Sequence, residues 1–319
     1  MTPSKRLYVG VGILLSVLVV ALGFKAGEAR QLKSAEGPAI GRASAAQDAS
    51  ISRLSAPAKA APEAVSTVSA GSVFSAAARR NAELQRELNW IFGGKSQRGW
   101  QLYAPLISSL IGADEDAQSL NFAMQLSRWQ KDKGVESHGI LDNYTWSQMI
   151  SDLQSHRIKD RSYPTAEQLV TAPASECFDP SRPEELRKVE RETYAAYKRM
   201  IAAAAADPSL GLATDDNGEL AAGEKYLKII SAFRSREYQD QLRKQSPNSG
   251  RAGLAVNSPH FTGRALDIYV GGEPVSTKDD NRAIQTQTKA YRWLVKNAPR
   301  FGFQPYFYEP WHWEYVGKN

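Results

Sequence analysis

The sequence predicts an α+β fold, in which a small all-α domain precedes a larger domain of helices and a small, mainly antiparallel sheet. Between residues 76 and 156, apolar residues recur at helical spacing. Between residues 183 and 319, helical patterns alternate with short apolar runs bounded by polar residues, as is typical of strands. Helices set against a short antiparallel sheet define the α+β class. One membrane helix is expected before both domains.

The composition is that of an ordinary globular chain with a mild positive charge. The chain has 319 residues, enough for two domains with linkers, is 42% hydrophobic and carries a formal charge of +6. It has no dense Lys/Arg tract and no nucleic-acid motif, so we expect a solvated basic surface and no nucleic-acid partner. Because Cys177 is the only cysteine, an intrachain disulfide and a cysteine-based zinc finger are excluded.

The N-terminus carries a segment long enough to cross a membrane. Residues 7–24 are nearly all apolar, which is about the minimum length for a membrane helix. Lys5 and Arg6 precede this segment, so we expect a single-pass anchor in the inner membrane with the bulk of the chain in the periplasm. The alternative is a signal peptide that is cleaved after export, although residues 25–30 make a poor cleavage site.

The chain then changes from a linker to a helical domain. Residues 25–75 are rich in Ala, Ser and Pro without lasting apolar periodicity, which predicts a disordered tether. The helical domain is expected at residues 76–156, where Gly93-Gly94 ends the first helix and Gly134 ends a later one. Its expected apolar and helical segments are 76–92, 100–111, 120–132 and 143–150.

A second linker is expected at residues 157–182, followed by the α+β domain at residues 183–319. The first helix of this domain should run from Pro183 to Ala206, because apolar residues fall at helical spacing and an alanine run favours helix. Asp207-Pro208 would stop it. Further helices are expected at 236–244 and 285–297, and strands at 226–233, 266–270, 302–303 and 311–315.

Two segments of this domain combine residues that can bind a metal ion. They are Ser258-Pro-His260-Phe-Thr-Gly-Arg-Ala-Leu-Asp267 and Glu309-Pro-Trp-His312-Trp. The spacing of His260 and Asp267 does not place them on one helical face and fits a loop that leads into a strand. With His312 from a neighbouring strand, these residues can occupy three corners of a tetrahedral zinc site and leave the fourth for water. Glu309 is then the candidate for the base that takes a proton from this water.

A structural interpretation of the same residues is the alternative. A buried histidine bonded to an aspartate is common in proteins, and His260 and Asp267 alone would be typical of such a pair. The presence of Glu309 and His312 in the same pattern favours a metal site. For Glu309 alone, a surface salt bridge is the alternative.

The pattern Ser-x-His-x-x-Gly-x-Ala-x-Asp followed by Glu-Pro-Trp-His-Trp-Glu-Tyr resembles the LAS metallopeptidases. More narrowly, it resembles the VanY-type D-alanyl-D-alanine carboxypeptidases over residues 189–315. The resemblance implies that His260, Asp267 and His312 bind Zn²⁺ and that Glu309 is the general base. The implied activity is a zinc-dependent peptidase acting on bacterial peptidoglycan.

An upstream segment extends this resemblance. Ser231-Ala-Phe-Arg234-Ser, followed by Gln239, matches the family's Ser-Gly-Tyr-Arg-Ser…Gln element, apart from the two residues before the arginine. The resemblance implies that Arg234 stabilises the charge that develops on the scissile carbonyl or holds a substrate carboxylate. A guanidinium suits either role because its planar fork donates two hydrogen bonds. Gln239 and Ser258 are the implied substrate contacts, and a structural ion pair is the alternative for Arg234.

The helical domain resembles the small peptidoglycan-binding domain found beside many wall hydrolases. The resemblance covers residues 105–152 and implies a second contact with the wall; the alternative is a helical spacer without a ligand. The chain departs from the family's usual residues at Ser137-His138. The residues that carry the resemblance are Phe122, Trp129, Gln130, Gly134, Gly139, Ile140, Leu141, Thr145 and Trp146.

The sequence leaves the bond that is cut open. A carboxypeptidase and an endopeptidase remain possible, as do a D,D and an L,D bond, because the choice depends on loops such as residues 246–257 and 271–282. Two other interpretations also remain. One is a non-catalytic wall-binding scaffold, which would hold no stoichiometric metal. The other is a zinc amidase or peptidase with a different small substrate.

Overall fold

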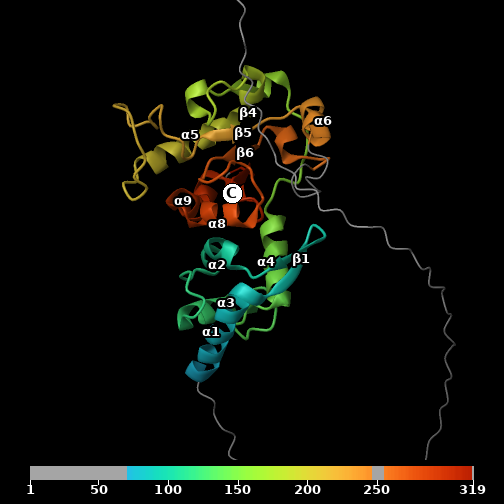
Figure 1. The fold of residues 1–319 in the computed structure, drawn as a ribbon, viewed down its shortest axis with the longest axis vertical. Helices are drawn as coiled ribbons and strands as arrows, with labels where there is room; N and C mark the ends of the chain where they lie inside the picture. The colour runs from blue at the N-terminus through green and yellow to red at the C-terminus, as the bar shows by residue number, and fades with distance from the viewer. Residues whose placement is uncertain (1–69, 246–254, 318–319) are drawn as a thin grey trace, which may run out of the picture. The chain divides into compact units, whose positions relative to one another are not determined.

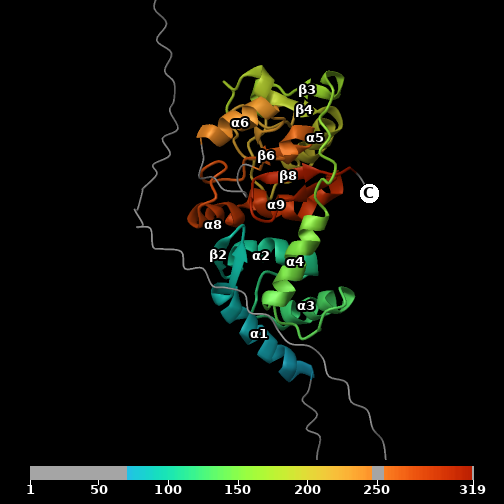
Figure 2. The same ribbon diagram turned by 90° about the vertical axis from the view of Figure 1, so that its right-hand side faces the viewer.

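A computed structural model of the chain describes residues 70–245 and 255–317, and all of them fall in one compact unit (Figures 1 and 2). The membrane segment predicted at residues 7–24 and nearly all of the tether predicted at residues 25–75 lie outside the described residues. Among the helices that the structure describes, none combines the length and the apolar character needed to cross a bilayer.

The first part of the described chain is mainly helical. Its helices are α1 (Ala70–Glu87), α2 (Ala104–Ile111), α3 (Leu120–Asp132) and α4 (Asn143–Ser155). Side-chain caps mark the starts of α3 and α4. Ser119 accepts a hydrogen bond from the backbone N–H of Phe122, and Asp142 accepts one from that of Thr145. The rings of Trp100 and Phe122 stack in the core, with their centroids 5.6 Å apart.

A hairpin corrects two predictions for this part. Residues 76–92 were expected to form one helix in an all-α domain, but α1 ends at Glu87 and the strands β1 (Asn89–Phe92) and β2 (Lys95–Arg98) follow. Gly93 and Gly94 both have positive φ, at 58° and 78°, as the tight turn of a hairpin requires. Trp90 is buried whereas Ile91 is 74% exposed, which is the alternation of a strand.

A buried polar network explains the motif that resembles a wall-binding domain. Gln130 accepts a hydrogen bond from the N–H of Gly139 at 2.8 Å and donates to the carbonyl of Ile140 and to Thr145. Asn81 on α1 donates to the carbonyl of Gly139 and accepts from the N–H of Leu141. The motif therefore builds the core and turn of this part, because these polar side chains satisfy buried backbone groups.

The second part holds a four-stranded antiparallel sheet in the order β5-β6-β8-β7. Antiparallel pairing and the mixture of helices with a small sheet agree with the predicted α+β class. The strands of this sheet are β5 (Ile229–Ser231), β6 (Ala265–Ile268), β7 (Phe303–Pro305) and β8 (His312–Tyr315). The helices are α5 (Arg191–Ala205), α6 (Arg236–Gln245), α8 (Asp279–Gln287) and α9 (Lys289–Asn297).

Three predicted boundaries in this part were wrong. The helix expected from Pro183 starts at Arg191, because the side chain of Glu190 caps it there. The residues before it form β4 (Lys188–Glu190), which pairs with β3 (Leu169–Thr171). The helix expected at 285–297 is two helices, α8 and α9, which meet at Thr288, whose hydroxyl caps the second. The strand expected at 226–233 is only three residues long, at Ile229–Ser231, and its pairing with β6 is irregular between these two residues.

The helical part packs directly against the second part. Figures 1 and 2 both show α2 beside α8 and α9, and Arg282 of α8 donates a hydrogen bond to the hydroxyl of Tyr103 at 2.8 Å. The hairpin contributes Phe92, whose ring lies 4.8 Å from that of Phe307 and 4.9 Å from that of Tyr308. These aromatic contacts therefore hold the segment that leads to Glu309.

Gly139 provides a test of the packing inside the helical part, with Gly134 as a matched control. Both have φ near +70°, but a Cβ at Gly139 would lie 2.6 Å from the carbonyl oxygen of Ala123, whereas nothing lies within 4 Å of one at Gly134. We expect Gly134→Ala to cost about 1–2 kcal/mol through its backbone conformation alone. Gly139→Ala should cost more, and each kcal/mol should lower the melting temperature by about 2–4 °C. Equal losses by differential scanning calorimetry would contradict the close packing at Gly139.

Candidate metal centre

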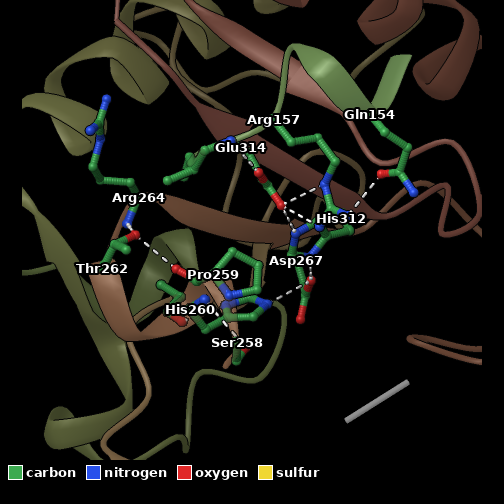
Figure 3. A network of polar contacts seen from close by, with 12 residues as sticks. Gln154, Arg157, Ser258, Pro259, His260, Thr262, Arg264, Asp267, His312 and Glu314 are labelled. Atoms are coloured by element: carbon green, nitrogen blue, oxygen red, sulfur yellow. Dashed lines mark hydrogen bonds and ion pairs between the residues drawn. The ribbon is translucent and has the colours of Figure 1, made fainter. Parts of the chain in front are cut away.

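Strand pairing brings the predicted ligands together. Asp267 on β6 and His312 on β8 are direct partners across the two antiparallel strands. Side chains of such a pair point to the same face of the sheet and lie close together. His260 comes from the 3₁₀ turn at Pro259–Thr262, which leads into β6, as the loop-to-strand prediction required. Figure 3 shows all three side chains converging.

The three side chains form a compact and buried donor group. Nδ1 of His312 lies 2.9 Å from Oδ1 of Asp267, and Nε2 of His260 lies 3.3 Å from the same oxygen. One ligand atom from each residue lies within 4.8 Å of the others. Their exposed fractions are 3% for His260, 2% for Asp267 and 4% for His312. Two imidazoles and a carboxylate are a donor set that zinc prefers.

The second nitrogen of each imidazole is hydrogen-bonded to an acceptor outside the group of three candidate ligands. Nδ1 of His260 lies 2.7 Å from the carbonyl oxygen of Ala232, which can only accept a hydrogen bond. Nε2 of His312 lies 3.2 Å from a carboxylate oxygen of Glu314. Metal-binding histidines usually donate their other N–H to such acceptors, which fixes the tautomer and the ring orientation. The structure therefore fits a metal bound by Nε2 of His260, Nδ1 of His312 and Asp267.

The charges around the two histidines differ. Burial, followed by the neighbouring Arg234, lowers the pKa of His260 to about 4, so this imidazole is neutral near pH 7. Burial opposes the charged form of His312, but its hydrogen bonds to Asp267 and Glu314 raise its pKa to about 9. Its Nδ1 proton faces Asp267 at the position where a dication would bind. A metal ion held by His260, Asp267 and His312 would therefore displace this proton.

Arg234 is bonded to Asp267, one of the three candidate ligands, and does not project freely. Its Nη2 donates to Oδ2 of Asp267 at 2.5 Å, and its Nε donates to the hydroxyl of Ser231 at 2.8 Å. Although burial opposes ionisation, His260 and Arg234 hold the pKa of Asp267 well below its usual range. The guanidinium thus orients Asp267 so that Oδ1 faces the two imidazoles.

Glu309 lies in the turn that leads into β8. Its backbone carbonyl accepts a hydrogen bond from the N–H of His312 at 2.9 Å, so the turn couples the two residues. Only 8% of Glu309 is exposed, and burial raises the pKa of its carboxyl to about 7. A carboxyl with a pKa near 7 can both accept and return a proton at neutral pH.

The two predicted substrate contacts, Ser258 and Gln239, bond to the backbone of the segment 255–260, which ends at His260. The hydroxyl of Ser258 accepts from the N–H of His260 at 3.3 Å and caps the turn that carries this ligand (Figure 3). Gln239 is buried on α6 and donates to the carbonyl of Ala255 at 3.1 Å. Both residues therefore shape the segment around His260, and their contact with substrate stays a prediction.

Sequence reasoning missed Glu314 and Arg157. Glu314 bonds His312 on one side and Arg157 on the other (Figure 3). A signal for Glu314 existed, because residues two apart in a strand point to the same face and Glu314 follows His312 at that spacing. Arg157 carried no local signal, since it lies in a segment predicted to be a linker.

The part of the chain that holds the candidate centre matches a known family. Residues 186–318 match the model of the VanY family, described as D-alanyl-D-alanine carboxypeptidase. The predicted VanY-like resemblance is therefore confirmed for this part of the chain. The chain has no match among the curated proteins with which it was compared.

Removing either imidazole should remove the metal. We expect the wild-type protein to bind one zinc ion per chain, and His260→Ala and His312→Ala to bind none at stoichiometric level, because two protein ligands rarely hold zinc. Inductively coupled plasma mass spectrometry of the purified proteins measures this. His156→Ala, an exposed histidine outside the donor group, is the control and should keep its zinc. Full zinc content in His312→Ala would contradict the assignment.

Proposed function

We propose that this protein is a zinc-dependent peptidase that hydrolyses the peptide stems of bacterial peptidoglycan, most specifically a D-alanyl-D-alanine carboxypeptidase. The match of residues 186–318 to the VanY family supports a peptidase of this kind. The observation that carries the proposal is the buried group of His260, Asp267 and His312, which lies inside the matched range and has its imidazoles oriented for a metal.

The described side chains supply the other parts of an amide hydrolysis. A zinc ion at this site would polarise the scissile carbonyl and make water more acidic. Glu309 then accepts the proton of the attacking water and returns it to the nitrogen of the departing D-alanine. Burial suits Glu309 to this exchange because it brings the pKa of the carboxyl to about 7.

Arg234 is proposed to stabilise negative charge on the substrate. Its Nε and Nη2 are held by Ser231 and Asp267, so the guanidinium is fixed before substrate binds. A fixed donor costs little reorganisation when charge develops on the carbonyl oxygen. The same cation suits the terminal carboxylate that a carboxypeptidase substrate carries.

We further propose that the chain acts outside the cytoplasm, anchored in the inner membrane by residues 7–24 or exported after their cleavage. The apolar segment preceded by Lys5 and Arg6 supports this location, and peptidoglycan lies in the same compartment. The residues that resemble a wall-binding domain build the core of the helical part, so they support its fold and not a glycan site.

The role of Glu309 can be separated from metal binding. Glu309→Gln keeps the shape of the side chain but cannot accept the proton, so we expect kcat to fall by about 10²–10⁴-fold. Zinc content should stay at one ion per chain. A Glu309→Gln protein with wild-type kcat on a peptide ending in D-Ala-D-Ala would contradict the base assignment.

The substrate is tested with defined muropeptides. Zinc-loaded protein should release one alanine from a stem ending in D-Ala-D-Ala, as read by mass spectrometry, and a chelator should abolish the reaction. Separation of a cross-linked dimer into monomers would instead show an endopeptidase. No cleavage by a protein that holds zinc would exclude this substrate class, and absence of bound zinc would favour the scaffold interpretation.

A further inference from the structure

Glu314 is a buried carboxylate whose partners come from two distant parts of the chain. It is fully buried on β8, two residues after His312. Besides the imidazole of His312, Oε1 accepts from Nε and Nη2 of Arg157 at 2.9 and 2.5 Å. Oε2 accepts from the backbone N–H of Ile158 at 2.8 Å. Arg157 and Ile158 follow α4 after one intervening residue, so the end of the helical part supplies most of the donors to this carboxylate.

Arg157 itself is held in one orientation. Its Nη1 donates to the side-chain oxygen of Gln154 at 3.0 Å, so all three guanidinium nitrogens are engaged. The guanidinium also lies over the ring of Tyr306, 4.0 Å from its centroid, and this ring contacts that of His312 at 5.9 Å. Figure 3 shows Gln154, Arg157, Glu314 and His312 in sequence.

We propose that Arg157 is a positioning residue for the metal centre, which orients the ligand His312 through the carboxylate of Glu314. This inference rests on the proposed zinc site. A carboxylate that accepts the Nε2–H of a metal-binding imidazole fixes both its tautomer and its ring plane. Arg157 holds Glu314 in the orientation that this contact needs, because its Nε and Nη2 both donate to Oε1.

Arg161 also lies near Glu314 but does not bond to it in the structure. Arg161 lies close enough to interact electrostatically with Glu314 and Arg157, but its Nη1 is buried and has no hydrogen-bond partner among the described residues. Apart from the bond from His312, the bonds to Glu314 from a side-chain cation therefore all come from Arg157 within the described part of the chain.

A contact elsewhere between the same two parts of the chain provides a matched control. Arg292 of α9 bonds Glu115, which lies between α2 and α3, at 2.9 Å. Like Arg157, this arginine links the two parts by an ion pair, but its side chain is 43% exposed and its other bond runs to Gln287. Arg292→Ala thus removes an ion pair between the parts without touching the ligands.

The experiment compares Arg157→Ala, Arg157→Lys, Glu314→Gln and Arg292→Ala in the full chain. The zinc dissociation constant is measured by competition with a chromophoric chelator, and the ligand geometry by the absorption spectrum of the cobalt-substituted protein. Thermal melting of each protein without metal reports folding. We expect Arg157→Ala and Glu314→Gln to weaken zinc binding about 10–100-fold and to change the cobalt spectrum. Arg292→Ala should match wild type in both.

If Arg157→Ala fails to fold, Arg157→Lys tests the role of Arg157 in its place. Lysine keeps a positive charge beside Glu314 but cannot bond it at two points, so we expect an intermediate zinc affinity and a shifted cobalt spectrum. Wild-type affinity and spectrum in a folded Arg157 variant would overturn the proposal. Equal losses in Arg292→Ala would also overturn it, because they would reflect loosened packing. Absence of zinc from the wild-type protein would instead refute the proposed function.

Discussion

The pairing of β6 with β8 determines the position of nearly every group in the candidate centre. Asp267 faces His312 and Ala265 faces Glu314 across the two strands, so the candidate ligand His312 and the carboxylate of Glu314 share one face. A slip of one residue would turn each of these side chains to the opposite face. The turns at either end then follow from the same pairing, since one carries His260 into β6 and the other carries Glu309 into β8.

Three buried carboxylates share this centre, and their surroundings give them different properties. Burial opposes ionisation in all of them, but Asp267 and Glu314 each have an arginine and a histidine close by, which keep their pKa low. For Glu309, burial outweighs its neighbours and the pKa rises to about 7. One functional group, the carboxylate, can thus serve in the proposed centre as a metal ligand, a fixed hydrogen-bond acceptor and a proton carrier.

The sequence predicted the parts of the site that depend on local patterns. His260, Asp267 and His312 were expected together because a turn, a strand and a neighbouring strand could bring them there, and the structure groups them. The hairpin at residues 89–98 was missed, because its apolar residues continue the spacing of the preceding helix until Gly93-Gly94. Arg157 was missed because it reaches Glu314 across 157 positions of the chain, and such a contact leaves no periodicity to find.

The bond between Arg157 and Glu314 also bears on where the functional unit of this chain begins. The family match starts at residue 186, yet the cation that compensates the buried Glu314 lies at residue 157, before that range. A fragment cut at the family boundary would lack Arg157 and Ile158, two of the residues that donate hydrogen bonds to Glu314. A buried carboxylate without these donors would lower the stability of the fragment. A fragment that keeps the candidate centre intact therefore starts before the family match and includes Arg157, which lies just after α4.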